Sequence, residues 1–570
     1  MKARYYESEL GYLREQGKVL ARRHPRTAGL LAERSDDPDV ERLLEGFAFL
    51  AAAVRERIDD AIPQLSSNYA GLLVPQLTRF VPPTSIIEYR PEATGLRGAE
   101  QVPRGTIVAG QVASGEEVSF QTTSALVLLP LTLEEVEQHK PQNDVDEVVL
   151  SLRASEQRDS PVGNHRLRLF LQGEPRFWMG LRTWFLRHCV EARLVKDEES
   201  WRLPHTEIRG LGDASEESLF PEQPLEHDGF TRLAEFFACP DKYAFIELPP
   251  LGDRARGEFK IVFRFSGAPK LPKRIVEKDV RLHCTPVINL FETDLEPASV
   301  DVFEPWQHLR ASRDADAELW ALTEVEGVGR DTRVRLHGFS EAGAGERAVS
   351  SYYVTRRESA SAGAGTRSYV ALMSCLDRRP PEDVSILSMR GLFSNRARAC
   401  ELGIGMLSRA VRGAGASTPF SNIKPVSPPL YPHEEASLVW RLGAHVGLSR
   451  KVLHDATSLR SVLRMYDFAA GDSPPLSEMN LRWIESIRDV SVVSCMRLVN
   501  GAPVTGSKTT VVVDAASFPS LGEACVFGEV LDDVFARRVE LNSFNVFCLE
   551  VAPTGARYVW KPRNGSERLA

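Results

Sequence analysis

The chain has 570 residues, of which 43% are hydrophobic and 26% are charged, and its formal net charge is −8. This composition is typical of a globular protein with several domains, and it excludes an intrinsically disordered chain. The acidic balance argues against general binding to nucleic acids or anionic membranes, which requires a basic surface. No stretch reaches the roughly 20 apolar residues of a membrane-spanning helix, and residues 1–26 lack the apolar segment of a secretory signal.

The eight cysteines lie far apart in the sequence and include no C-x-x-C pair. This spacing is typical of reduced thiols in the cytosol and not of a disulfide scaffold. His283–Cys284 and His188–Cys189 are adjacent pairs of metal-ligand types, but neither has the second pair of ligands that a structural zinc site requires. We expect no metal and no cofactor, and we expect His188 and Cys189 to lie on a helix as a surface or core pair.

Residues 1–84 are predicted to form a helical segment. In the first predicted helix, Tyr6, Leu10, Leu13, Gly17 and Leu20 recur at steps of four and three residues. A second helix is predicted to begin after Asp37, with Pro38 at its first position, and to end near Ile62 because Pro63 disfavours a helical residue before it. A third, shorter helix is expected over residues 66–73.

The second predicted helix carries a wide apolar stripe. Its main positions are Val40, Leu44, Phe47, Ala51, Val54, Ile58 and Ala61, and Leu43 and Leu50 widen it. Such a stripe is more often packed within its own domain, yet a stripe this wide has to be buried on more than one side. Three short helices offer little cover, so we predict a partner interface. The predicted interface residues are Leu43, Leu44, Phe47, Leu50, Ala51, Val54 and Ile58.

The middle of the chain is predicted to be a mixed α+β domain over residues 85–295. Short β-branched segments punctuated by Gly and Pro indicate strands. The predicted strands are 85–91, 105–112, 116–123, 125–133, 146–154, 165–173 and 257–267. Helices are expected over residues 176–195 and 229–245.

The last two predicted domains are a β-rich region over residues 296–430 and a helical, then β region over 431–570. Residues 413–435 are rich in Gly, Pro and Ser and are the predicted linker between them. A strand is expected at 351–356, a helical block at 435–468, and strands at 492–498, 508–514 and 544–552. The predicted fold class is therefore multidomain α+β.

Candidate catalytic motifs are weak. Ser421 and Lys424 match the S-x-x-K pattern, but they lie in the predicted linker and lack partner motifs. The glycines at 327–332 and 363–368 lack the lysine or third glycine of nucleotide-binding loops and are predicted turns. The acidic pairs Asp59–Asp60 and Asp532–Asp533 are interpreted as a solvated helix face or a turn. A hydrolase or transferase whose site is assembled from scattered residues is the alternative to a structural protein.

Five longer stretches, in order along the chain, resemble the TssF family of type VI secretion baseplate subunits. The stretches are residues 5–65, 230–248, 282–298, 437–468 and 527–547. The third carries the most specific motif, with Cys284, Thr285 and Pro286 followed by Asn289, Leu290 and Phe291. Residues 103–128 also resemble a segment of contractile-phage baseplate wedge proteins. One departure from the family pattern falls at 391–405, where Asn395 and Arg396 remain but an Asp-Leu-Pro stretch is absent.

The resemblance implies a scaffold without catalytic activity, metal or cofactor. It implies pairing with a second TssF copy and binding to TssG within each baseplate wedge. It further implies contacts of the wedges with TssK, TssE, the sheath end and the spike protein VgrG, in the cytoplasm against the inner membrane. The N-terminal apolar stripe fits such an assembly because helical bundling holds the family's wedge together.

Overall fold

The computed structural model describes residues 3–23, 39, 42–52, 54–55, 77–91, 96, 98–142, 145–154, 161–212, 215–221, 228–301, 305–338, 351–359, 365–374, 384–412, 418–432, 455–499, 502–536, 539 and 542–564. These residues fall into two compact units, one before residue 74 and one from residue 74 onward. Helices and several β-sheets are both present, so the predicted α+β class is confirmed. The four-domain division stays a prediction.

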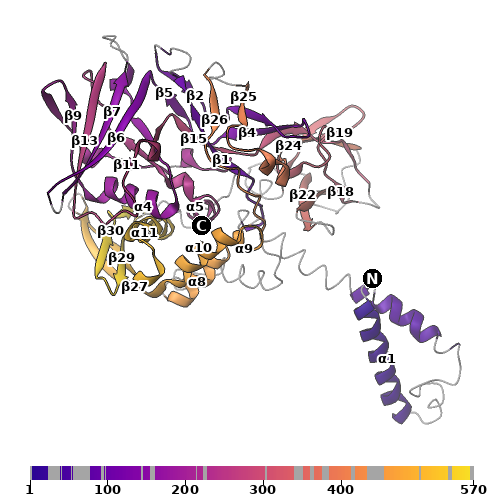
Figure 1. Ribbon diagram of the computed structural model, residues 1–570. Coiled ribbons are helices and arrows are strands. Elements are labelled where there is room, and N and C mark those ends of the chain that lie inside the picture. The colour runs from indigo at the N-terminus through magenta and orange to yellow at the C-terminus, as the bar shows by residue number, and fades with distance from the viewer. Residues whose placement is uncertain are drawn as a thin grey trace. The chain divides into compact units, whose positions relative to one another are not determined.

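The first unit is helical in its described part. Helix α1 spans Ala3–Arg23, and a second helix covers residues 42–52 and 54–55 (Figure 1). An ion pair between Arg55 and Glu9 joins the second helix to α1. Both predicted helices are therefore present, while the predicted ends of the second helix and the third helix over 66–73 lie outside the described residues.

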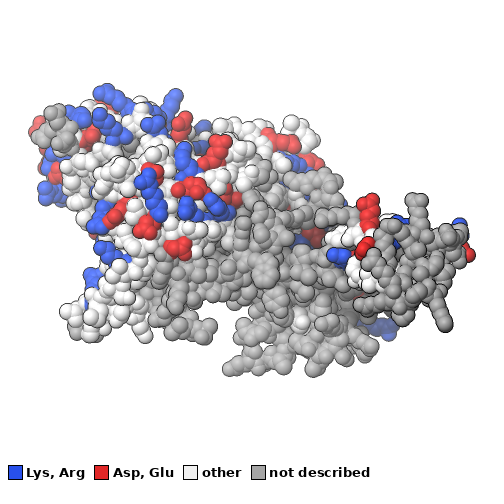
Figure 2. Space-filling view, turned by 90° about the horizontal axis from the view of Figure 1, so that it is seen from below, with Lys and Arg blue, Asp and Glu red and all other residues white. Residues whose placement is uncertain are grey.

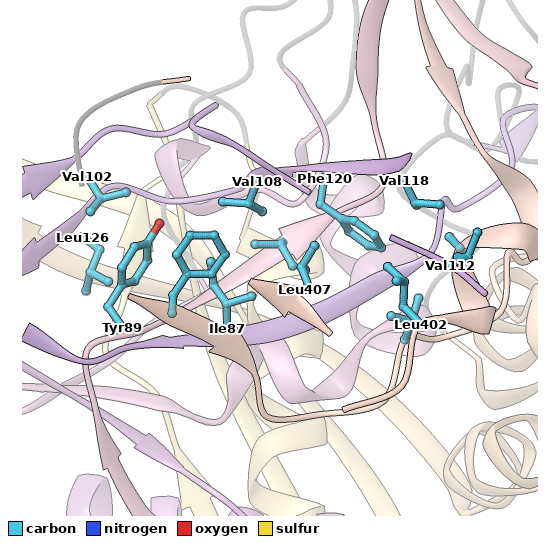
Figure 3. Packing of buried hydrophobic residues seen from close by; sticks show 14 of the residues in the cluster. Ile87, Tyr89, Val102, Val108, Val112, Val118, Phe120, Leu126, Leu402 and Leu407 are labelled. Carbon is cyan, nitrogen blue, oxygen red and sulfur yellow. The ribbon is translucent and has the colours of Figure 1, made fainter. Parts of the chain in front are cut away.

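A six-stranded sheet lies at the centre of the second unit. Its strands, in spatial order, are β25 (Leu407–Arg412), β3 (Ile107–Gln111), β4 (Glu117–Thr122), β15 (Cys284–Ile288), β1 (Thr84–Tyr89) and β26 (Phe420–Asn422). Ile87, Val108 and Phe120 point from these strands into one buried cluster, together with Leu402 and Leu407 (Figure 3). Apolar alternation along each strand places these side chains on a single face.

Two further sheets and a strand pair follow from the middle of the chain. One sheet has the order β10 (Glu199–Leu203), β9 (Cys189–Lys196), β13 (Glu258–Ser266), β7 (Val145–Ala154) and β6 (Leu131–Gln142). The other has the order β11 (Arg209–Gly210), β12 (Phe245–Leu248), β8 (Leu167–Leu171) and β14 (Val280–Leu282). The pair consists of β2 (Glu100–Val102) and β5 (Leu126–Leu128).

Two more sheets come from residues 291–394. The first has the order β16 (Phe291–Asp294), β24 (Ile386–Ser394), β19 (Glu318–Val328) and β20 (Arg333–Arg335), and β17 (Ala298–Ser299) also pairs with β24. The second has the order β18 (Gln307–His308), β23 (Thr366–Ser374), β22 (Ser351–Ser359) and β21 (His337–Gly338). A buried cluster that includes Phe393, Val370 and Val325 packs between their strands.

The C-terminal part is helical and then mixed (Figure 1). Its helices are α8 (Ala456–Arg464), α9 (Ala469–Asp472), α10 (Pro474–Glu485) and α11 (Leu521–Ala536). Its sheet has the order β27 (Ile487–Val499), β28 (Ala502–Asp514), β29 (Phe544–Ala552) and β30 (Ala556–Val559), with β31 (Arg563–Asn564) also paired to β29. The three predicted C-terminal strands are confirmed.

The predicted helix over residues 176–195 is wrong in its second half. Helix α4 (Pro175–Thr183) continues as a single π-helical stretch, η5 (Trp184–His188), and Cys189 then begins β9. Cys189 therefore lies in a strand and not on the predicted helix with His188. Strand β9 pairs with both β10 and β13, and this long-range pairing overrides the local helix propensity of residues 189–195.

The predicted helix over residues 229–245 is also shorter than expected. Helix α5 spans Asp228–Ala238 and is followed by a 3₁₀ turn, η8 (Pro240–Tyr243), before β12. Pro240 disfavours a helical conformation at the residue before it, and Cys239 has φ −141° and ψ 72°. The other 3₁₀ turns are η4 (Pro161–Asn164), η6 (His205–Glu207), η7 (Ser215–Glu217), η9 (Glu277–Asp279), η10 (Arg396–Glu401) and η12 (Ala515–Ser517).

Part of the predicted linker at 413–435 belongs instead to a sheet. Residues 420–422 form β26, which pairs with β1 at the edge of the six-stranded sheet. Phe420, Val426 and Leu430 are buried, so this segment belongs to the core in spite of its prolines. Proline is compatible with edge positions of a sheet because the missing N–H is not needed there.

Candidate partner-binding surface and family motifs

The second helix of the first unit exposes a row of large apolar side chains. Leu43, Phe47, Leu50 and Val54 are each more than half exposed, and the exposed fraction of Phe47 is 61%. Their spacing of four, three and four residues puts them on one side of an α-helix. We call these four residues the apolar face.

The other side of the same helix is buried. Ala48 and Ala52 have no exposed surface. At 100° per residue they lie roughly opposite the apolar face. The small alanines and the Arg55–Glu9 ion pair therefore mark the side that packs within this unit, and the apolar face is the side left open.

The structure places the seven predicted interface residues as follows. Leu43, Phe47, Leu50 and Val54 form the exposed apolar face, and Leu44 and Ala51 are half-buried at its border. Ile58 lies outside the described residues. A contiguous exposed apolar patch is a frequent mark of a protein-protein contact site, and what covers this one stays a proposal.

The most specific sequence motif is buried inside the sheet. Cys284, Thr285 and Pro286 belong to β15, and Asn289 and Leu290 follow it with no exposed surface. Burial raises the pKa of the Cys284 thiol well above its ordinary value, so it is not a reactive thiolate. Phe291 is half-buried at the start of β16.

His283 precedes this motif in a left-handed conformation, with φ 54°. Its Nε2 lies 3.1 Å from the carbonyl oxygen of Leu131, and burial lowers its pKa to about 4. The neutral imidazole therefore serves as a hydrogen-bonding group of the core at neutral pH. Within the described part of the chain, no group of three or more His, Cys, Asp or Glu side chains is placed to hold a metal ion.

Asn289 is the centre of a buried hydrogen-bond network. Its Nδ2 donates to the carbonyl oxygen of Ser119 at 2.8 Å and to Oδ1 of Asn395 at 3.0 Å. Its Oδ1 accepts from Oγ of Ser394 and from the backbone N–H of Asn395, each at 2.7 Å. All four hydrogen-bonding positions of the amide are thus used. The motif residue Asn289 and the retained Asn395 of the divergent stretch hold each other in place.

The divergent stretch at 391–405 makes its own charged contacts. Arg396 has φ 55° and forms an ion pair at 2.9 Å with Glu318, whose side chain has no exposed surface. Arg398 forms ion pairs with Asp314 and, at 2.7 Å, with Glu116. These pairs tie η10 to the sheet around β19 and to the six-stranded sheet, so the retained Asn395–Arg396 has a structural role within the chain.

The prediction that Asp532 and Asp533 form a solvated face is wrong. Both are buried on α11. Arg563 lies 3.2 Å from Asp532 and 3.0 Å from Asp533, and Arg232 lies 2.8 Å from Asp533. Burial raises the pKa of Asp532 to about 7, and the guanidinium of Arg563 acts in the opposite direction. The other acidic pair, Asp59–Asp60, lies outside the described residues.

A further ion pair on α11 reaches the middle of the chain. Glu529 accepts two hydrogen bonds from the buried guanidinium of Arg182 on α4, one of them at 2.8 Å. Bidentate pairs of this kind fix geometry as well as charge. The Arg182–Glu529 and Arg232–Asp533 pairs together join α11 to α4 and α5, which lie far from α11 in the sequence.

The S-x-x-K motif does not form a nucleophile pair. Ser421 lies in β26, and its Oγ accepts a hydrogen bond from Arg90 at 3.4 Å. The amine of Lys424 forms an ion pair with Asp241 at 3.0 Å and donates to the carbonyl oxygen of Gly173. The lysine is therefore bound to other groups and is not positioned as the base for Ser421.

Charges on the sheet of β10, β9, β13, β7 and β6 are balanced across neighbouring strands. Arg153 pairs with Glu134 at 2.9 Å and with Glu258 at 2.8 Å, and Arg264 pairs with Glu147 at 2.9 Å. On the face that Figure 2 shows, Lys and Arg are likewise interspersed with Asp and Glu. Such cross-strand pairs stabilise a sheet locally and do not form a uniform surface for a polyanion.

Comparison with known proteins identifies the family. The family model described as "Type VI secretion system, TssF" matches residues 2–567. The chain belongs to the TssF family. The type VI secretion system component TssF1 of Pseudomonas aeruginosa is 27% identical to it, over 99% of this chain and 98% of the relative. The resemblance drawn from the five sequence stretches is therefore confirmed.

Solved structures agree with this assignment. A chain of a TssK-TssF-TssG baseplate subcomplex, solved by cryo-electron microscopy, is similar with a TM-score of 0.74 and 26% identity, covering 93% of this chain and 99% of that chain. A chain of "the baseplate complex from the type VI secretion system" is similar with a TM-score of 0.61 and 25% identity over the full length of both chains. The TssF family is thus a family of baseplate subunits, and this chain shares its fold.

Sequence reasoning missed two sets of structural residues in this TssF-family chain. The Asn289–Asn395 network joins residues more than 100 positions apart. The only sequence signal was that Asn289 belongs to the most specific family motif and that Asn395 is retained in the divergent stretch. The buried acidic residues of α11 follow residues 524–531, which are apolar or glycine except for Glu529, and such a run indicates a buried helix in which Asp532 and Asp533 need partners. No helix among the described residues is long and apolar enough to cross a membrane.

Proposed function

We propose that this chain is a structural subunit of a type VI secretion baseplate wedge that pairs with a second copy of itself and binds TssG. Membership of the TssF family and the similarity to a TssK-TssF-TssG subcomplex support this proposal. The proposed mechanism is non-enzymatic: the chain supplies a rigid multi-sheet body and a helical segment that joins it to other subunits.

The observation that carries the proposal is the apolar face of the second helix. Four large apolar side chains are exposed on one side, while Ala48 and Ala52 on the other side are fully buried. A helix that satisfies its packing with alanines and leaves Leu43, Phe47, Leu50 and Val54 in water has its larger hydrophobic surface available for another chain. We propose that helices of TssG or of a second copy cover this face in a helical bundle.

We further propose that the assembled wedge meets TssK, TssE, the sheath end and the spike protein VgrG. The TssK contact is supported by the similarity to a chain of a TssK-TssF-TssG subcomplex, and the others rest on the family resemblance. The proposed location is the cytoplasmic side of the inner membrane, where a baseplate has to meet the rest of the machine. The unrecognised hydrolase or transferase remains the alternative, and no arrangement among the described residues favours it.

Co-expression tests the proposal. A chain that exposes apolar surface when alone is expected to aggregate when expressed singly and to become soluble and monodisperse when co-expressed with TssG from the same gene cluster. Size-exclusion chromatography with light scattering gives the stoichiometry. A stable monomer that shows no affinity for TssG, or a turnover of a test substrate by the pure chain, would contradict the proposal.

A further inference from the structure

Strands β27 and β28 form a hairpin that extends beyond its sheet. The two strands pair from Ile487 with Val513 to Val499 with Ala502. Strand β29 pairs with β28 only from Ser507 to Asp514. Residues 495–499 and 502–506 are therefore a two-stranded arm, and we call them the β27–β28 arm.

One face of the hairpin passes from the buried core into solvent. Val490 and its partner Val511 are buried in the sheet. Because side chains on a strand alternate between two faces, Met496 and Leu498 lie on the same face as Val490. They are 77% and 72% exposed. Beyond Ser494, where β29 no longer extends beside β28, the apolar side chains of this face are therefore uncovered.

The outer edge of β27 is unpaired in the described part of the chain, where β28 is the only strand next to it. This strand is 13 residues long. Natural sheets protect edge strands by shortness, proline, bulges or charge, since an open edge of N–H and C=O groups can pair with another chain. The single irregularity in the pairing of β27 with β28 is at its base, between Ile487 and Asp489, and leaves the arm regular.

The hairpin from Val490 to Lys508, which includes the arm, is positively charged in an acidic protein. Between Val490 and Lys508 the charged residues are Arg497 and Lys508, both positive, whereas the whole chain has a net charge of −8. Neither forms an ion pair with another described residue. By the same alternation, both lie on the face opposite Met496 and Leu498.

We propose that an acidic, extended segment of another protein adds to β27 as a further strand. Its apolar residues pack beside Met496 and Leu498 on one face. On the other face its Asp or Glu residues lie beside Arg497, and Lys508 adds positive charge on that face from β28, one strand further away. Backbone hydrogen bonds to the open edge supply affinity, and the alternation supplies specificity. A lipid bilayer is a poorer fit because its hydrocarbon region cannot satisfy the unpaired edge groups. This site is separate from the apolar face on which the proposed function rests.

A fluorescent eight-residue peptide of alternating Val and Glu, capped at both ends, is the probe for this site. It is titrated against the full-length chain, purified alone or with its baseplate partners, and followed by anisotropy. Wild-type protein is expected to bind it. Met496→Glu with Leu498→Glu, and separately Arg497→Glu with Lys508→Glu, are expected to weaken binding by at least roughly tenfold. Ile404→Glu is the matched control, because Ile404 is 64% exposed outside this sheet, and it is expected to leave binding unchanged.

Two measurements need no variant. A probe with N-methyl groups on alternate residues cannot form a ladder of hydrogen bonds, and a probe with Lys in place of Glu has the wrong charge. Both are expected to bind at least roughly tenfold more weakly to the wild-type chain. If the N-methylated probe or the Lys probe binds as tightly as the Val/Glu probe, the proposal is overturned. It is also overturned if the Val/Glu probe does not bind. Binding of the chain to phosphatidylglycerol vesicles that is abolished by Met496→Glu with Leu498→Glu would assign the arm to a membrane and also overturn it.

Discussion

Replacing Phe47 with Asp places a carboxylate at the centre of the apolar face. Because Phe47 is 61% exposed, this change is expected to alter the free energy of unfolding of the chain by only about 0.5 kcal/mol. In the assembled wedge, completing the burial of this phenylalanine contributes roughly 1–2 kcal/mol, since full burial of such a side chain contributes about 1.5–3 kcal/mol. An unpaired carboxylate in the covered interface costs at least about 2 kcal/mol more.

The two effects together predict a loss of about 3 kcal/mol or more in the free energy of association. At about 1.4 kcal/mol for each factor of ten, the affinity for TssG or for a second copy falls at least roughly 100-fold. The assay is co-purification of tagged TssG with the variant, beside thermal melting of both proteins. Phe49→Asp is the matched control: Phe49 is 54% exposed on the same helix but lies about 100° or more from the apolar face.

The expected pattern is that Phe47→Asp loses its partners while keeping the wild-type melting temperature, and that Phe49→Asp keeps both. Wild-type binding by Phe47→Asp would show that the apolar face is not the interface. An unfolded Phe47→Asp chain would show that the face is covered within the chain itself. Equal losses for the two variants would mean that the effect is one of helix propensity and not of a specific face.

Three other changes have defined outcomes. Asn289→Ala removes one hydrogen-bond partner each from the carbonyl oxygen of Ser119, the hydroxyl of Ser394 and the backbone N–H of Asn395, and each buried group left unsatisfied costs about 1–3 kcal/mol. A drop of at least about 2 kcal/mol in the free energy of unfolding is expected in urea, and an unchanged midpoint would show that the network does not stabilise the core. The pKa of Asp532 is about 7 in the folded chain and lower when unfolded, so its contribution to stability is complete below about pH 4 and is lost as the pH rises through 7. Asp532→Asn should therefore flatten the decline of melting temperature between pH 5 and pH 8, and a parallel decline would refute this. Lys424→Ala is expected to leave secretion intact, because the lysine is part of an ion pair and not of a catalytic site.

The apolar face and most strands could be predicted from the sequence because they depend on local periodicity. Steps of three and four residues place Leu43, Phe47, Leu50 and Val54 on one side of a helix, whatever surrounds that helix. Alternation in Phe259, Ile261 and Phe263 likewise requires a strand with one buried face, as β13 has. Neither pattern states what covers the apolar side.

The wrong predictions have a common cause, which is that long-range contacts decide the structure at these residues. Residues 189–195 are compatible with a helix, and only their pairing with β10 and β13 makes them a strand. Asp532 and Asp533 look solvated until Arg232 and Arg563, distant in sequence, are placed beside them. The segment around Phe420 has the composition of a linker, but it forms a strand because its backbone pairs with the edge of β1. In each case, a partner outside the local window decides the structure.

The most direct test of the proposed function is a cryo-electron microscopy structure of this chain purified with its own TssG and TssK. The proposal predicts that Leu43, Phe47, Leu50 and Val54 are covered in that complex by helices of TssG or of a second copy. A complex in which these four side chains remain in solvent, with the subunits joined elsewhere, would contradict the proposed role of the apolar face.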